Sequence, residues 1–156
     1  MRNFCLTIGL SFAAAAAAAP PLNVGIAYEI ARNDSPLADV DQRLEHDGRT
    51  YTLSETWKGK GLYALRGEAV RSSRGAIVAD GKRVTSYTYK VAGRERVKTP
   101  AGEFDALKLV KRKDNPLDKA TEVWLAVDQQ YIPVRILVVE KDGTRLDQVA
   151  VKISVR

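Results

Sequence analysis

Hydrophobic residues occupy every second position over most of the chain beyond its first 20 residues. Val24, Ile26, Tyr28 and Ile30 form the first such series. A period of two is that of a β-strand with one buried face, so the pattern predicts strands along nearly the whole chain. Further series lie at Tyr51–Trp57, Tyr87–Val91, Leu107–Leu109, Val123–Val127, Tyr131–Val139 and Val149–Val155.

Turn-forming residues separate these segments. Asp-Gly pairs are strong hairpin signals because type I′ turns need residues that tolerate positive φ. We therefore predict an all-β fold of about eight strands, an antiparallel meander that forms a curved sheet or incomplete (half) barrel. Residues 58–71 come nearest to an amphipathic helix, but three glycines interrupt them. The turn signals are Asp47-Gly48, Asp80-Gly81, Ala92-Gly93, Ala101-Gly102, Asp114-Asn115-Pro116 and Asp142-Gly143.

The stretch Thr99-Pro100-Ala101-Gly102 raises the choice between a ligand-binding loop and a hairpin turn. Pro100 fixes φ at the second position, and Gly102 tolerates positive φ near the end. We predict a tight turn between the strand at Val97 and the strand from Phe104 to Lys111, and assign it no ligand.

The first 19 residues have the layout of a secretory signal peptide. Arg2 is followed by an uncharged apolar stretch, Phe4–Ala19, that ends in small residues. We expect residues 1–19 to be removed, leaving one domain, residues 20–156, in the periplasm or otherwise exported. The alternative, a membrane anchor, falls short of the roughly 20 strongly apolar residues that a span needs. Cys5 lies in the leader, so the remaining chain has no thiol for a disulfide, a nucleophile or a zinc site.

Basic residues outnumber acidic ones, 25 to 19 in the whole chain and 24 to 19 without the leader. A basic exported protein suits anionic lipid headgroups or polyanionic envelope polymers. A solubilising surface is the alternative, and nucleic acid does not fit an exported protein. One cluster could form a headgroup-binding patch or a solvated strand face: Arg66, Arg71, Arg74, Lys82 and Arg83.

Residues for catalysis or metal binding are sparse. His46, the single histidine, precedes a predicted turn, and no Gly-x-Ser-x-Gly elbow accompanies it. Asp39 and Asp41 are spaced i, i+2 and would share a face if they lay in a strand, but no calcium-loop pattern follows them. We therefore expect no enzyme activity, no metal and no cofactor. An outer-membrane barrel is disfavoured because aromatic residues make up only 7% of the chain.

Two tryptophans stand out. Trp124 alternates with Val123 and Leu125, so both faces of that strand are apolar and either protein or a ligand covers them. Core packing is one account. The other is a cavity suited to an acyl chain, lined by Trp57, Leu62, Leu65, Trp124 and Tyr131, with Arg66, Arg71 or Arg135 near a headgroup.

Three C-terminal motifs occur in order: Val97-Lys98-Thr99-Pro100-Ala101-Gly102-Glu103-Phe104-Asp105-Ala106, Val123-Trp124-Leu125-Ala126 and Tyr131-Ile132-Pro133-Val134-Arg135-Ile136. Together with Gly61-Leu62-Tyr63-Ala64-Leu65 and Ser73-Arg74-Gly75, they resemble the DUF3108 family of exported bacterial proteins. The resemblance implies a half-barrel similar to periplasmic lipoprotein carriers, whose concave face holds acyl chains, and it implies no reaction. The family pattern has further strands in its centre, where Arg83 to Val91 joins the two halves directly here.

Two functional hypotheses follow. The first is an exported, non-enzymatic envelope protein that binds a lipid or another amphiphile in a concave sheet. The second is a protein–protein interaction module of the envelope that pairs through exposed strand edges. The short central region favours the second, because it would shrink the cavity and leave edges open.

Overall fold

The computed structural model describes residues 21–77, 88–113, 115 and 118–156. Several sequence-based predictions fall outside these residues. They are the signal peptide 1–19 with Cys5, the Asp80-Gly81 turn, Lys82 and Arg83 of the basic cluster, Tyr87, and the flanks of the Asp114-Asn115-Pro116 turn.

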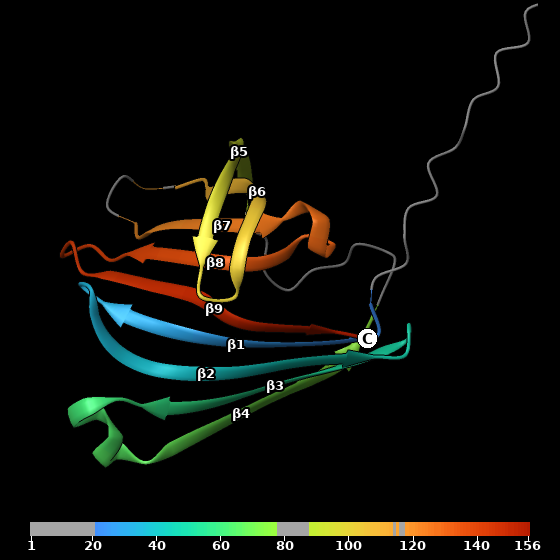
Figure 1. Cartoon of the computed structure of the whole chain (residues 1–156), viewed down its shortest axis with the longest axis horizontal. Helices are drawn as coiled ribbons and strands as arrows, with labels where there is room; N and C mark the ends of the chain where they lie inside the picture. The colour runs from blue at the N-terminus through green and yellow to red at the C-terminus, as the bar shows by residue number, and fades with distance from the viewer. Residues whose placement is uncertain (1–20, 78–87, 114, 116–117) are drawn as a thin grey trace, which may run out of the picture.

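Nine antiparallel strands of the described chain form one open sheet, in the order β4-β3-β2-β1-β9-β8-β7-β6-β5 (Figure 1). This confirms the all-β prediction of an antiparallel meander that does not close. The strands are β1 (Asn23–Arg32), β2 (Ser35–His46), β3 (Thr50–Gly59), β4 (Glu68–Ala76), β5 (Tyr89–Thr99), β6 (Gly102–Lys111), β7 (Ala120–Ala126), β8 (Ile132–Val139) and β9 (Arg145–Val155). Two short 3₁₀ helices join them, η1 (Gly61–Arg66) after β3 and η2 (Val127–Gln129) after β7.

The sheet consists of two meanders, which are joined by pairing between the first and the last of the nine described strands. Strands β1 to β4 form one meander and β5 to β9 the other, and β1 pairs with β9 in the middle of the sheet. The backbones of Asn23 and Arg156 exchange two hydrogen bonds, of 3.1 and 3.0 Å. Strands β4 and β5, which follow one another in sequence, therefore lie at opposite edges.

Three of the predicted turns are hairpin turns in the structure. Gly48 and Gly143 have φ of 84° and 82°, and they lie between β2 and β3 and between β8 and β9. The Thr99–Gly102 turn joins β5 to β6, with Gly102 at φ 141°. Its Ala101 N–H donates to the hydroxyl of Thr99 at 3.2 Å and to the carbonyl of Ala150 in β9 at 3.0 Å. This turn is therefore also a contact that holds the hairpin on the sheet.

The Ala92-Gly93 prediction was wrong. Gly93 lies inside β5, where the register with β6 shifts between Val91 and Gly93, so this glycine marks a β-bulge. We also did not predict β2 or the turn before it, in which Asn33 and Asp34 have φ of 46° and 66°. The described residues form nine strands where we expected about eight, and η1 forms within the segment 58–71.

The core lies where the β5–β6 hairpin packs against the middle of the sheet. Figure 1 shows this hairpin in front of β7 to β9. From the hairpin, Val97, Phe104 and Ala106 are buried. The central strands contribute Ile26, Tyr28, Ile30, Val40, Trp124, Ala126, Ile132, Val134, Leu137 and Ala150. The alternation from Val24 to Ile30 thus predicted the buried face of β1 correctly.

Tyr28 links three strands of this core. It is 1% exposed, lies opposite Ala150 of β9, and donates its hydroxyl to the carbonyl of Pro133 in β8 at 2.9 Å. Burial raises the pKa of the Tyr28 phenol well above its usual range, and the nearby charge of Glu55 raises it further. The phenol of Tyr28 is therefore neutral in the folded protein.

We expect the free energy of unfolding to fall as the pH rises above about 10, the pKa of an unperturbed tyrosine. The raised pKa in the folded state means that unfolding releases a proton there, so stability is complete below that pH and is lost above it. Tyr28→Phe should remove this part of the slope and cost about 1 kcal/mol at neutral pH, the net value of one hydrogen bond.

Urea unfolding from pH 8 to 11 measures both effects. Tyr131→Phe, at an exposed tyrosine, is the control and should keep the wild-type slope. The carboxylates of Asp39 and Glu29 raise the pKa of Lys60, whose contribution stays in all three proteins. Equal slopes for wild type and Tyr28→Phe would contradict the assignment.

Candidate functional site

The eight residues proposed to line a cavity lie in separate parts of the sheet. Trp57 and Arg71 lie on β3 and β4, and the Arg71 guanidinium is 5.4 Å from the centre of the Trp57 ring. Trp124 and Arg135 form a second pair on β7 and β8. Leu62, Leu65 and Arg66 belong to η1, and Tyr131 lies between η2 and β8.

Trp124 is a core residue, 4% exposed. The indole N–H donates to the carboxylate of Glu95 in β5. Trp124 pairs with Lys108 of β6 on one side and Arg135 of β8 on the other, and the two cations lie 4.7 and 5.0 Å from its ring. The first of our two accounts, core packing, therefore explains why both faces of this strand carry apolar groups.

The two cations beside Trp124 are themselves held by acids. Lys108 lies 2.8 Å from the carboxylate of Glu122. Arg135 donates two hydrogen bonds to Asp147, at 2.9 and 2.6 Å, and this contact raises the pKa of Arg135. The ring attracts each cation, and the paired acid offsets the cost of partly burying its charge. Trp124 is therefore buried in the core. The period of hydrophobic residues in the sequence could not predict that Lys108 and Arg135 flank its ring.

An apolar pocket of about 260 Å³, here called the inner pocket, lies against β1, β2 and β3. The loop before β8 closes one side of it with Tyr131, one of the eight proposed lining residues. Gln130 and Tyr131 both have positive φ, 55° and 60°, so this is a tight connection. The other lining residues are Pro21, Val24, Ile26, Gln42, Leu44, His46, Leu53, Gln130, Ile132 and Pro133.

His46 is at the rim of the inner pocket. Its Nε2 lies 2.8 Å from the carbonyl of Pro21, and its backbone N–H donates to the carbonyl of Leu22 at 2.9 Å. These contacts hold the segment before β1 against the end of β2. Leu44 escaped prediction as a lining residue because we did not recognise β2.

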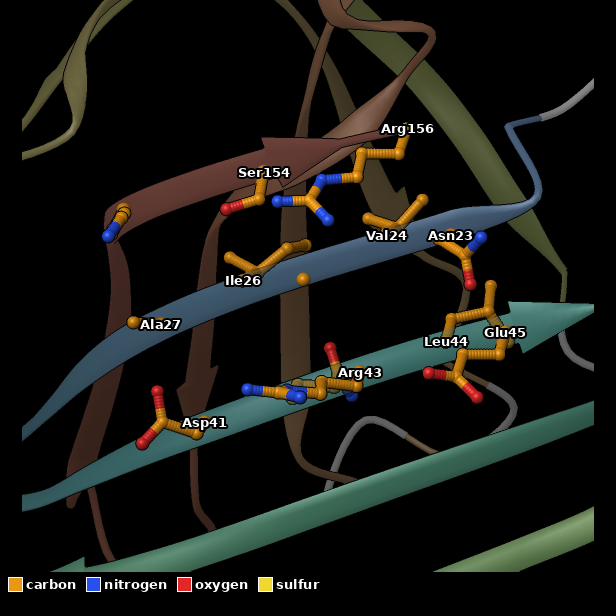
Figure 2. A pocket seen from close by; sticks show the side chains of 13 residues that line it. Asn23, Val24, Ile26, Ala27, Asp41, Arg43, Leu44, Glu45, Ser154 and Arg156 are labelled. Carbon is orange, nitrogen blue, oxygen red and sulfur yellow. The ribbon is translucent and has the colours of Figure 1, made fainter.

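A polar groove of about 490 Å³ crosses β2, β1 and β9 (Figure 2). Asp41, Arg43 and Glu45 line it from β2, and they pair with Ala27, Gly25 and Asn23 of β1 respectively. Acids and bases alternate along this wall, and Lys152 and Arg156 line the groove from the side of β9, so the lining carries both signs of charge. Among the described residues no group of three His, Cys, Asp or Glu could hold a metal ion.

Strand β4 forms one edge of the sheet, and all of its residues except Gly75 are exposed. Arg71 stacks on Trp57, and Arg74 lies 3.4 Å from the hydroxyl of Thr52. Neither arginine has a carboxylate within salt-bridge distance in the described part of the chain. The nearby Glu55 accepts hydrogen bonds from Gln42 at 2.9 Å and from the Trp57 indole at 3.2 Å.

Strand β5 forms the other edge, and its arginines are paired. Arg94 forms an ion pair with Asp105, and Arg96 lies 3.2 Å from Glu103, both acids on β6. The two open edges therefore differ in their arginines. Those of β5 pair with acids of β6, whereas Arg71 and Arg74 of β4 have no described carboxylate within salt-bridge distance, although Glu55 lies opposite Arg71 in the register.

Comparison with known protein families finds a match to the family described as "Protein of unknown function (DUF3108)" over residues 62–149, from η1 into β9. The chain belongs to the DUF3108 family. The match confirms the resemblance carried by the Thr-Pro-Ala-Gly turn and the two following motifs. No curated protein matches this DUF3108 chain.

Two solved structures share the fold. MucB, solved in complex with MucA(peri), superposes with a TM-score of 0.52 at 19% identity. The superposition covers 85% of the DUF3108 chain and 49% of that MucB chain, so our chain spans about half of it. A candidate lipoprotein from Parabacteroides distasonis ATCC 8503 superposes with a TM-score of 0.51 at 8% identity. This superposition covers 86% of the DUF3108 chain and 96% of the lipoprotein chain. In the described residues, no helix is long and apolar enough to cross a membrane.

We expect Trp124→Ala to lower the free energy of unfolding by about 3–5 kcal/mol, the range for removing a buried tryptophan. Trp57→Ala is the matched control and should cost less than half as much, because Trp57 packs at the margin of the core and is only partly buried. Denaturant unfolding of both variants measures the difference. Equal losses would contradict the assignment of Trp124 to the core.

Proposed function

We propose that this DUF3108 protein is an exported, non-enzymatic protein of the bacterial cell envelope that binds a partner protein through the open edge of β4. The observation that carries the proposal is the pair Arg71 and Arg74 on this exposed edge strand, neither of which has a described carboxylate within salt-bridge distance. Export is supported by the leader pattern that follows Arg2.

An edge strand can bind a partner through its backbone. Among the described strands, β4 pairs with β3 alone, and nine residues from Glu68 to Ala76 are extended. An extended segment of another protein can continue the sheet there by main-chain hydrogen bonding, and side chains on alternate positions give specificity. The charge of Arg71 and Arg74 selects a segment with acidic residues.

Relatives in fold support a protein as the partner. MucB was solved bound to MucA(peri), so at least one protein with this sheet takes a protein ligand.

A photo-reactive amino acid at position 70 tests the docking edge. Val70 is 68% exposed on β4, and we expect it to crosslink to one envelope protein in living cells. Val91 is 63% exposed on the opposite edge strand, β5, and is the matched control that should not crosslink to that protein. Crosslinks of equal yield at both positions, or no crosslink at either position, would refute the assignment of the docking edge to β4.

Charge reversal tests the acidic character of the partner. Arg74→Glu should weaken the crosslink at position 70 at least tenfold, because an acidic segment would then meet a like charge. Arg112→Glu changes the net charge equally at an exposed site beyond β6 and should leave the yield unchanged. An unaffected yield with Arg74→Glu would show that the partner is not selected by charge.

The inner pocket supports a second candidate function, the binding of an amphiphile. Its wall combines Leu44, Leu53 and Ile132 with the ring of Tyr131, and polar groups lie at its rim. Its volume of about 260 Å³ suits part of an acyl chain.

Native mass spectrometry of protein isolated from the periplasm tests this second function. We expect an added mass of a few hundred daltons or more that organic solvent releases and that Leu53→Glu abolishes. Val151→Glu, at an exposed position on β9, should keep it. A clean protein mass that stays unchanged after fatty acids or phospholipids are added would exclude amphiphile binding.

A further inference from the structure

The 3₁₀ helix η1 presents two leucines to solvent. Leu62 and Leu65 are 86% and 87% exposed, the largest values among the exposed hydrophobic side chains of the described residues. Residues three apart in a 3₁₀ helix lie above one another, because the helix has three residues per turn. The two side chains therefore form one apolar ridge, here called the leucine ridge.

The leucine ridge stands on a braced base. A Cβ at Gly59 would lie 2.3 Å from the carbonyl oxygen of Tyr63, so the backbones of β3 and η1 are in direct contact. The Lys60 N–H donates to the carbonyl of Leu37 at 2.9 Å, and its ammonium lies 2.8 Å from Glu29 and 2.7 Å from Asp39. The exposure of the leucines is thus a property of a fixed turn.

The segment that carries the ridge has only basic side chains of its own, and acids of β1, β2 and β4 compensate its two lysines. Residues 58 to 66 contain Lys58, Lys60 and Arg66 and no acidic residue. Lys60 is held by its two acids, and Lys58 lies 3.7 Å from Glu68. The Arg66 guanidinium lies 5.8 Å from the ring of Tyr63, and no carboxylate of the described chain lies within salt-bridge distance of it.

We propose that η1 docks the protein on an anionic lipid bilayer, with Leu62 and Leu65 in the acyl boundary and with Tyr63 and Arg66 among the headgroups. Leucines in the apolar layer, an amphipathic aromatic ring above them and an arginine that reaches the phosphates make up an interfacial anchor. A short ridge fits a bilayer because it needs no shaped cavity opposite it. This site is separate from the β4 edge and does not depend on it.

Co-sedimentation with vesicles tests the anchor. The protein is isolated from cells in its processed form, and mass spectrometry determines its N-terminus. Its binding to vesicles of phosphatidylcholine alone is then compared with its binding to vesicles that also contain phosphatidylglycerol. We expect binding to the anionic vesicles that high salt weakens. Leu62→Ser combined with Leu65→Ser should lower the partition coefficient at least tenfold, and Arg66→Glu should lower it on anionic vesicles only.

The matched control is Val91→Ser combined with Val151→Ser, which removes two exposed apolar side chains elsewhere and should bind as wild type does. All these side chains are exposed, so thermal unfolding should be unchanged in each variant. The proposal would be overturned if the wild-type protein bound neither kind of vesicle, or if the leucine variant bound anionic vesicles as well as the wild type does. A dimer that the leucine variant converts to monomer, without vesicle binding, would assign the ridge to a second copy and also overturn it.

Discussion

The pairing of β1 with β9 is the constraint on which the rest of the sheet depends. Each meander is built from neighbours in sequence, but β1 and β9 are separated by more than 110 residues and still share a register from Val24 to Arg32. Without this pairing each half would be a smaller sheet with an additional open edge and half of a core. Tyr28 reinforces the junction, because its ring lies beside Ala150 and its hydroxyl reaches the carbonyl of Pro133.

The β5–β6 hairpin completes what this junction begins. Strand β8 pairs with β9 only as far as Val149, and one residue later the Ala150 carbonyl accepts the N–H of Ala101. The hairpin tip therefore satisfies a backbone group where β8 leaves β9, and it covers the centre of the sheet with Val97 and Phe104. Burial concentrates at this centre, which leaves β4 and η1 as the exposed parts of the first meander.

The parts of this fold that follow from local patterns were predictable. The alternation from Val24 to Ile30 indicated a buried strand face, and Asp47-Gly48 and Asp142-Gly143 indicated hairpins, because period and turn chemistry act over a few residues. Gly93 misled us because glycine serves a bulge as well as a turn. The candidate sites were less accessible to prediction. The difference between the arginines of β4 and β5 depends on which strand lies beside each, and no short window of sequence contains that information.

The central position of β1 and β9 also constrains how the protein can be made. A chain is synthesised from its N-terminus, so β1 is among the first strands to appear and β9 is the last. The first meander can form early, but one side of β1 stays without its neighbour until Val155 has been added. Such a late, long-range closure favours slow folding, with an unpaired strand exposed in the interval. A nascent chain held unfolded until its last residues are complete would avoid that exposure.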